Sequence, residues 1–234
     1  MLYDHLTDSL EKEYDTVRVL KRNERGSVAL LRHKSTGQLF VYHNYKGNAD
    51  VYRKLLEISC SGLPQIYEAA EKNGMAAIIE EYIQGDSLAM LLEADLFTPE
   101  QTCRIAKQIC QALWVLHSLG AVHRDVKPDN VLLRGDQAVL IDFDASRVVK
   151  NEKKEDTQVL GTTGYAPPEQ YGMAQTGPQS DIYALGVMMN VMLTGEHPSK
   201  KLAQGHLGRV IQRCTHISPG RRYKNVLRLM EDIR

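Results

Sequence analysis

The first third of the chain alternates short apolar runs with turn-forming residues, which is the pattern of β-strands. Turn chemistry such as Ser35-Thr36-Gly37 separates the runs, and a helical pattern over residues 49–59 interrupts them. The predicted strands cover residues 15–21, 27–32, 39–44 and 75–82. We therefore expect a small antiparallel β-sheet with one helix in this part of the chain.

The rest of the chain has mostly the apolar spacing of helices. Residues 98–101, T-P-E-Q, form a strong helix start. Thr98 can cap the helix, Pro99 suits its first position, and Gln101 completes a capping box. A turn at Gly135-Asp136 separates a predicted strand pair over residues 131–133 and 139–141. Further helices are predicted over residues 181–193, 206–214 and 222–232.

The change from strand to helix near Gly85 sets the expected boundary between two lobes. Residues 1–82 are predicted to form a β-rich lobe with one helix, and residues 83–234 a mostly helical lobe. The predicted fold class is therefore α+β. A cleft between the two lobes is the expected ligand site.

Charge and composition exclude several classes of function. Lys and Arg together number 29, as do Asp and Glu, so no overall field attracts nucleic acid or an acidic membrane. The N-terminus lacks the apolar core of a signal peptide, and the most apolar stretch, residues 182–193, is too short to span a bilayer. The four cysteines form no C-x-x-C pair, which favours reduced thiols. We expect a cytoplasmic protein that binds neither nucleic acid nor membrane.

Two motifs carry the candidate chemistry. Residues 123–130 read H-R-D-V-K-P-D-N, and Asp142 of an I-D-F-D run follows Asp125 by seventeen residues. Asp125 can accept the proton of an attacking hydroxyl, and Lys127 lies where its cation can reach the transferred phosphate. Mg²⁺ prefers oxygen ligands, which Asn130 and Asp142 supply. The two runs resemble a known signature of phosphoryl transfer from ATP, and this resemblance implies Asp125 as the base and Mg²⁺ held by Asn130 and Asp142.

With these motifs the chain resembles the bacterial Ser/Thr protein kinases, which share the eukaryotic-like kinase fold, and the resemblance covers nearly the whole chain. Residues 161–169, G-T-T-G-Y-A-P-P-E, are similar to the G-T-x-G-Y-x-x-P-E segment of that family. The match implies that Thr162 contacts Asp125 and Lys127 and helps to form the substrate platform. It also implies a bilobal, protein kinase-like fold, and transfer of the ATP γ-phosphate to a serine or threonine of a protein substrate.

The same resemblance assigns structural roles to three residues. Glu169 would form an ion pair with a buried arginine, for which Arg222 has the family's position. Asp181 would brace the backbone of residues 123–130, which the resemblance makes the catalytic loop.

The resemblance also assigns a nucleotide site. Residues 79–85, I-E-E-Y-I-Q-G, look like the family's hinge, in which backbone groups of Glu81 and Ile83 would hold the adenine edge. Glu80 takes the gatekeeper position. The residues expected to sandwich the adenine ring are Val28, Val41 and Leu132.

Two departures from the family pattern lie in the nucleotide-binding part. Residues 21–28, K-R-N-E-R-G-S-V, align with G-x-G-x-x-G-x-V, so Gly26 is the glycine that survives. Glycines let backbone N–H groups approach phosphates closely, and their loss predicts a looser grip, or a grip by Lys21, Arg22 or Arg25. A charged turn with no ligand role is the other interpretation.

The second departure is His43, which takes the place of the lysine in the family's V-A-I-K strand. Histidine is mostly neutral at pH 7 and shorter than lysine, so it cannot replace a permanent cation on the phosphates. Lys46 either reaches in from the end of the strand or is solvated. The usual ion pair between this lysine and a helix glutamate is expected to be absent. In the D-F-G motif, Asp144 replaces the glycine.

Three functions therefore stay open on the sequence. The first is an active Ser/Thr kinase. The second is a pseudokinase, a binding or scaffold module that holds nucleotide weakly or not at all; the lost glycines and His43 favour it, and the intact catalytic loop argues against it. The third is a small-molecule phosphotransferase, which residues 141–144 would suit and residues 161–169 would not. The sequence identifies neither the substrate protein nor the oligomeric state.

Overall fold

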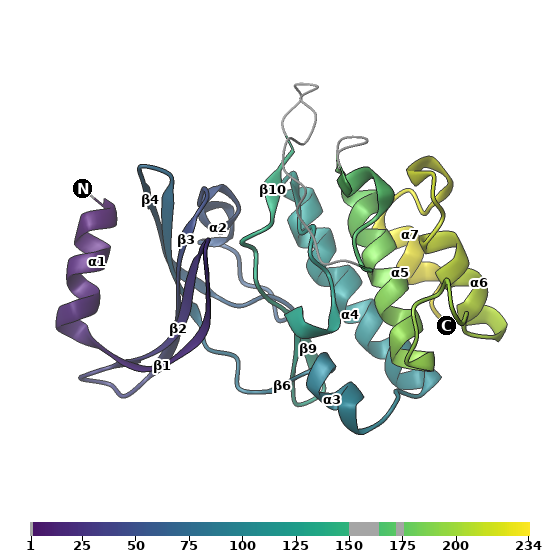
Figure 1. The fold of residues 1–234 in the computed structure, drawn as a ribbon, viewed down its shortest axis with the longest axis horizontal. Coiled ribbons are helices and arrows are strands. Elements are labelled where there is room, and N and C mark those ends of the chain that lie inside the picture. Colours follow the sequence, from purple (N-terminus) through teal and green to yellow (C-terminus); the bar gives the residue numbers. More distant parts are fainter. Residues whose placement is uncertain (1, 150–163, 172–175) are drawn as a thin grey trace. The chain divides into compact units, whose positions relative to one another are not determined.

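The computed structural model describes residues 2–149, 164–171 and 176–234. The chain divides into two compact units (Figure 1). The first unit comprises Met1–Cys60 and Pro64–Gln84, and the second comprises Ser61–Leu63 and Gly85–Arg234.

A five-stranded antiparallel sheet forms the body of the first unit. Its strand order is β1-β2-β3-β5-β4, so β1 and β4 are the edges. The strand over residues 66–72, I-Y-E-A-A-E-K, is not predicted from the sequence, because alanine and glutamate are poor strand formers. The strands are β1 (Tyr14–Asn23), β2 (Gly26–His33), β3 (Leu39–Lys46), β4 (Ile66–Lys72) and β5 (Met75–Glu81).

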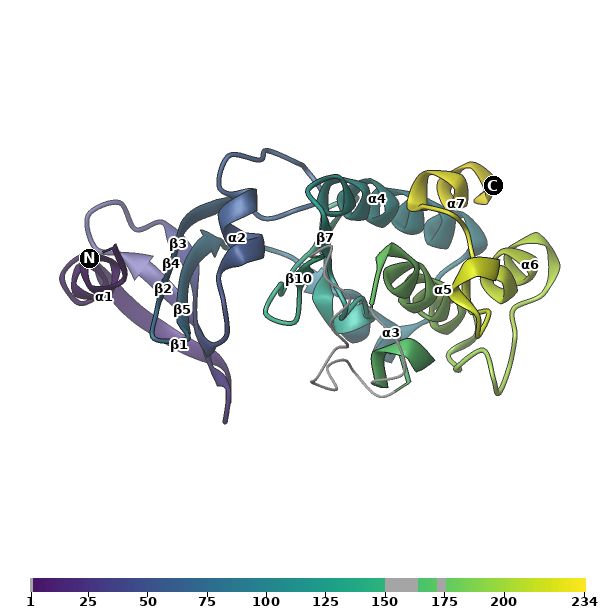
Figure 2. The same cartoon turned by 90° about the horizontal axis from the view of Figure 1, so that it is seen from above.

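Helix α1 (Leu2–Glu13) covers one face of this sheet, and Figure 2 shows α2 on the opposite face. Leu6 of α1 is buried in a cluster whose other members lie on the strands: Phe40, Ala70, Ala77 and Ile79. The Lys34 ammonium donates hydrogen bonds to the carbonyl oxygens of Glu11 and Lys12, at 2.9 and 3.0 Å. A cation at a helix C-terminus satisfies terminal carbonyls and complements the helix dipole. We call this side of the sheet the α1 face.

Helix α2 (Asp50–Leu55) lies on the other side, which we call the α2 face. Its buried Tyr52 ring lies beside His43, with ring centroids 5.8 Å apart. The helix is shorter than the predicted 49–59, because the N–H of Ile58 bonds the carbonyl of Leu55 in a turn instead of continuing the helical ladder.

The second unit is built mainly from helices. Thr98 caps α4: its hydroxyl accepts from the backbone N–H of Gln101, and the side-chain oxygen of Gln101 accepts from the backbone N–H of Thr98. This capping box confirms the predicted start. Helix α5 is buried along most of its length, so its sequence is almost continuously apolar. The α-helices are α3 (Leu88–Ala94), α4 (Pro99–Ser118), α5 (Pro178–Thr194), α6 (Gly205–Cys214) and α7 (Val226–Asp232).

The second unit also contains two small β-sheets. Strands β8 and β9 form the predicted hairpin, and Gly135 at its turn has φ of 60°. One sheet contains β6 (Asp86–Ser87), β8 (Val131–Arg134) and β9 (Gln137–Leu140), and the other contains β7 (Ala121–Val122) and β10 (Arg147–Val148). Short 3₁₀ turns lie at Pro128–Asn130, Pro168–Tyr171 and Pro219–Arg221.

An antiparallel sheet in one unit and a mostly helical second unit confirm the predicted α+β fold class. Across the residues that the structure describes, no helix combines the length and the apolarity needed to cross a bilayer.

Candidate active site

One buried carboxylate holds the backbone of the loop after β7. Asp181 of α5 accepts the backbone N–H groups of His123 (2.9 Å) and Arg124 (2.8 Å), and its Oδ2 lies 2.8 Å from Nε2 of His117. This bonding confirms that Asp181 braces the catalytic loop. Arg124 has φ of 71°, a left-handed conformation that is costly for a residue with a side chain. The two hydrogen bonds at its end of the loop help to maintain that conformation.

The environment of Asp181 decides its charge. Full burial by itself raises the pKa of this carboxyl. The hydrogen bond from His117, the nearby charges of His117 and His123, and the N–H of Arg124 outweigh burial and lower the pKa below its ordinary value. Asp181 is therefore an anion at neutral pH, which suits an acceptor of three hydrogen bonds.

Two side chains of the loop converge on the carboxylate of Asp125. Asn130 donates from Nδ2 to Oδ2 of Asp125 and also to its backbone carbonyl, both at 2.9 Å. The Lys127 ammonium lies 3.0 Å from the same Oδ2. The side chains of Lys127 and Asp125 are 18% and 14% exposed, so both reach the surface of the unit. One cation and one amide donor therefore hold the Asp125 carboxylate in place.

The β8–β9 hairpin brings the backbone before Asp142 back to this loop. The N–H of Ile141 donates to the carbonyl of Asn130 (2.9 Å), and Nε2 of His123 lies 3.1 Å from the carbonyl oxygen of Ile141. Asp142 therefore follows directly on a residue that is bonded to both ends of the loop. This is the approach to Asn130 that the predicted strand pair requires.

In the D-F-D motif of residues 142–144, the unusual backbone angle lies at Asp142 and not at Asp144. Position 144 can therefore hold an aspartate. Asp142 has φ of 66°, whereas Asp144 is not among the described residues with positive φ. The N–H of Asp144 donates to Oδ1 of Asp142 at 3.3 Å. A glycine is therefore not required at position 144 on conformational grounds.

A buried ion pair anchors the segment that precedes α5. Arg222 donates to Glu169 through both terminal nitrogens, at 2.6 and 2.9 Å, and Ser180 adds a hydrogen bond of 3.0 Å to the same carboxylate. The predicted pairing of Glu169 with Arg222 is confirmed. A bidentate, hydrogen-bonded pair of this kind is the geometry in which a buried ion pair is tolerated.

Several predicted nucleotide residues lie on the first unit's sheet. Val28, Val41 and His43 share the α2 face, since Val28 pairs with His43 and Leu30 with Val41 across β2 and β3. At the end of β5, the N–H of Glu81 donates to the carbonyl of Gln65 at 2.8 Å. Ile83 is buried just beyond that strand, and Leu132 belongs to the second unit, on β8.

A buried pair within this sheet is an interaction that the sequence does not predict. Nε2 of His43 lies 3.0 Å from Oε1 of Glu80, and both side chains are only 4% exposed. Glu80 belongs to β5, so this contact is made across the sheet and not with helix α2. The histidine in the lysine position and the glutamate in the gatekeeper position thus contact each other in the interior.

The surviving glycine of the β1–β2 hairpin has a packing role. A Cβ atom on Gly26 would lie 2.1 Å from the carbonyl oxygen of Asn44 and 2.6 Å from Cα of Tyr45 on β3. The close approach of β2 to β3 therefore requires glycine here.

Lys46 pairs with Met75 and, by strand alternation from Tyr45, extends on the α1 face, so it does not reach the α2 face from the strand end.

The remaining predicted residue, Thr162, lies outside the described residues.

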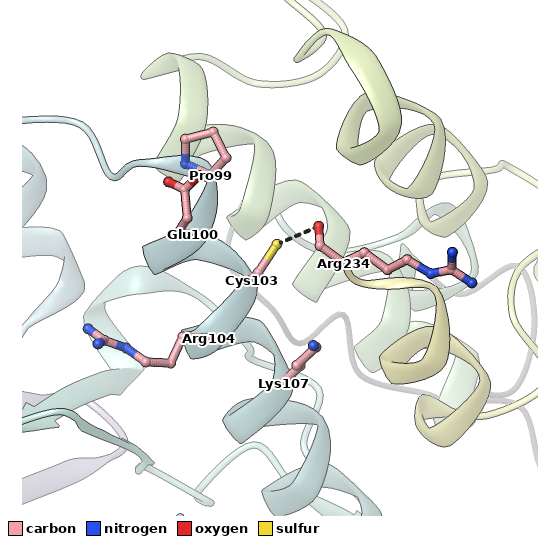
Figure 3. A pocket seen from close by; sticks show the side chains of 6 residues that line it. All are labelled: Pro99, Glu100, Cys103, Arg104, Lys107 and Arg234. Atoms are coloured by element: carbon pink, nitrogen blue, oxygen red, sulfur yellow. Dashed lines mark hydrogen bonds between the residues drawn. The ribbon is translucent and has the colours of Figure 1, made fainter.

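A separate hollow of about 470 Å³ lies elsewhere on the second unit, where the Cys103 thiol donates to the carbonyl of Arg234 (Figure 3). Burial is the main reason that the pKa of Cys103 is raised, so its thiol is protonated at neutral pH. The hollow contains no residue of the catalytic loop; its lining is Pro99, Glu100, Cys103, Arg104, Lys107 and Arg234.

Comparison with known proteins agrees with this arrangement. The protein kinase domain family matches residues 15–227, which is most of the chain, and the chain therefore belongs to that family. It is 32% identical over 80% of its length to mitogen-activated protein kinase kinase 2 of Arabidopsis thaliana.

Bacterial Ser/Thr kinases are also similar to the chain. The chain is 29% identical over 74% of its length to serine/threonine-protein kinase pkn2 of Myxococcus xanthus. It is 33% identical over 67% of its length to serine/threonine-protein kinase PknA of a Nostoc strain. The chain spans 54% of the Arabidopsis protein, 21% of the Myxococcus protein and 30% of the Nostoc protein. The predicted resemblance to eukaryotic-like Ser/Thr kinases is confirmed.

Proposed function

We propose that the chain is an active Ser/Thr protein kinase, which transfers the γ-phosphate of ATP to a hydroxyl of a protein substrate. The observation that supports this proposal best is the cluster at one loop, where Lys127 and Asn130 both contact the Asp125 carboxylate. A binding or scaffold module has no need for a base, a cation and an amide held together in this way.

The Asp125 carboxylate acts as the base that accepts the proton of the substrate hydroxyl. Lys127 serves two purposes in this proposal: its ammonium holds the Asp125 carboxylate in place and neutralises charge on the transferred phosphate.

Asn130 and Asp142 would hold Mg²⁺. Their donor set fits that ion, because an amide oxygen and a carboxylate are hard oxygen ligands. The amide nitrogen of Asn130 donates to Asp125, so its amide oxygen is the atom assigned to the metal. When bound, Mg²⁺ supplies charge neutralisation on the phosphates.

The nucleotide base would be held by apolar side chains and by the chain after β5. Val28, Val41 and Leu132 would contact the ring, and backbone groups of Glu81 and Ile83 would hold its edge. Gly26 and His43 shape the sheet beneath the nucleotide: Gly26 by letting β2 approach β3, and His43 by holding Glu80.

Phosphoryl transfer with a matched pair of variants tests the proposal. The chain is incubated with labelled ATP, Mg²⁺ and a generic protein substrate, beside Asp125→Asn and Asp129→Asn. Both variants remove one negative charge from the same loop, but Asp129 is exposed and has no assigned role. We expect Asp125→Asn to lower the rate roughly 10²–10⁴-fold at unchanged ATP affinity, and Asp129→Asn to remain near wild type.

The same assay separates the competing functions. ATP binding without any transfer would support a pseudokinase, for which the His43–Glu80 pair in place of a lysine is the favouring observation. Transfer to a small molecule but never to protein would support a small-molecule phosphotransferase. Equal labelling by wild type and Asp125→Asn would contradict the assignment of the base.

A further inference from the structure

One cation of the β1–β2 hairpin lies on the same face of the sheet as the residues proposed for the nucleotide. Lys21 pairs with Val28 across β1 and β2, and Val28 pairs with His43 across β2 and β3. Side chains of directly opposed residues leave a sheet on the same side. Lys21, Val28 and His43 therefore form a row across three strands on the α2 face.

A β-bulge in β1 places the Lys21 side chain on the α2 face. Val19 pairs with Ala29 and Lys21 pairs with Val28, so Leu20 is an extra residue in β1. With strict alternation, Leu20 would stand opposite Val28, and Lys21 would turn to the α1 face. Bulges commonly re-aim a side chain beside a functional site, and this bulge brings a cation onto the α2 face.

Position 43 supplies no permanent positive charge of its own. The His43 imidazole is held by Glu80 at 3.0 Å, inside the sheet, and the Tyr52 ring lies against it. Lys46 extends on the α1 face, as the strand register requires. Neither His43 nor Lys46 of strand β3 therefore offers a permanent cation to phosphates on the α2 face.

Lys21 is close enough to His43 to bring a positive charge to the place where His43 supplies none. Neighbouring strands are about 4.7–4.9 Å apart, so Cα of Lys21 lies about 10 Å from Cα of His43, with Val28 between them. A lysine side chain is flexible and about 6 Å long, and it presents a compact charge at its end. From its exposed position, Lys21 can carry that charge over Val28, towards the space above His43.

We propose that Lys21 is the phosphate-binding cation of the nucleotide site, which takes over the charge that His43 lacks. The ligand group is the phosphate chain of a nucleoside di- or triphosphate. This proposal rests on the ATP binding proposed above. Because Gly26 is required for the packing of β2 against β3, its presence does not by itself indicate a phosphate grip by backbone N–H groups, and a side-chain cation is the alternative.

Nucleotide titrations of three variants test this assignment. Lys21→Ala removes the cation, Lys21→Arg keeps it, and Arg22→Ala removes a neighbouring cation that pairs with Ser27 and so leaves the sheet on the α1 face. The probes are ATP and adenosine, which differ in the phosphates, each titrated by calorimetry at low and moderate salt. Thermal melts check that all variants are folded.

We expect Lys21→Ala to weaken ATP binding roughly tenfold, as for a lost charge-assisted bond at an exposed site, and to leave adenosine binding unchanged. Lys21→Arg should retain ATP affinity within about threefold, and Arg22→Ala should match wild type. The ATP affinity of Lys21→Ala should also depend less on salt than that of wild type.

Equal ATP affinity in wild type and Lys21→Ala would overturn this assignment while leaving the proposed kinase activity intact. A parallel loss of adenosine binding would also overturn it, because it would mean that Lys21 supports the sheet and not the phosphates. Failure of wild type to bind ATP at all would instead remove the proposed function, and this inference with it.

Discussion

His43 and Glu80 are two ionisable side chains buried in the sheet of the first unit. They lie on neighbouring strands as a diagonal pair, because Val41 is directly opposite Glu80 and His43 is opposite Ile78. Each polar group would be costly to bury by itself, and the 3.0 Å contact between them offsets part of that cost. At the scale of single residues, an unusual side chain in one position explains the unusual side chain in the other.

Replacing one member of the pair should harm stability more than replacing both. We expect His43→Leu or Glu80→Leu to lower the free energy of unfolding by about 2–4 kcal/mol, because each leaves the other's polar group without this partner in the interior. The double variant should lose at least about 1 kcal/mol less than the sum of the two. Denaturant unfolding of all four proteins measures the coupling; strictly additive losses would contradict it.

At the scale of elements, the catalytic loop depends on helix α5. Asp181 of this helix lies 58 residues after His123 in the sequence, and it accepts the backbone N–H groups of His123 and Arg124. A single carboxylate of a buried helix therefore fixes the start of the loop that carries Asp125.

Removing the charge of Asp181 should loosen the catalytic loop. Asp181→Asn keeps the size of the side chain, but its amide nitrogen cannot accept hydrogen bonds, so about 2–4 kcal/mol of stability should be lost. We expect the rate of phosphoryl transfer to fall at least about tenfold with a smaller change in ATP affinity, since the loop and not the nucleotide is disturbed. Steady-state kinetics would contradict this if the rate stayed at the wild-type value.

The lowered pKa of Asp181 gives this brace a defined pH dependence. Burial opposes the shift, but the His117 hydrogen bond and the other partners hold the folded pKa below the ordinary 3.8. A depressed carboxyl pKa stabilises the fold above the unfolded value, and that stability is lost as the pH falls through the folded value. The stability advantage of wild type over Asp181→Asn should therefore be present at about pH 5 and shrink below about pH 4. Denaturant unfolding across this range measures it, and an advantage that persists unchanged at about pH 2 would contradict it.

Elements set by local sequence could be predicted, and elements set by distant contacts could not. The start of α4 is predictable because the capping box of Thr98 and Gln101 is complete within the first turn. Helix α1 and strand β4 are not, because α1 depends on burying Leu6 against distant strands and β4 is poor in β-branched residues. The catalytic loop is predictable from its motif. The pairing of His43 with Glu80 is not, since it depends on the register of strands whose residues are 37 apart.

At the scale of the whole molecule, each unit has its own means of stabilisation. The first unit relies on a sheet covered by helices, and the second on buried helices and the ion pair of Glu169 with Arg222. Substitutions in one unit should therefore affect its own backbone most.

Hydrogen exchange can detect this division. Leu6→Ala should cost about 2–4 kcal/mol and lower the protection of amides in β3 and β5 more than in α4 and α5. Arg222→Met, which leaves Glu169 buried without its cation, should cost about 3–5 kcal/mol and show the opposite bias. An equal loss of protection in both units from either variant would argue against separate stabilisation.

Because α1 buries apolar residues of the sheet, the place at which the chain is truncated matters for expression of a shorter fragment. The family match begins at residue 15, after α1 has ended. A fragment cut at that boundary would uncover Phe40 and Ile79, both now buried, as part of a contiguous apolar surface. Such a fragment should aggregate during purification, even though it would contain every motif by which the family is recognised.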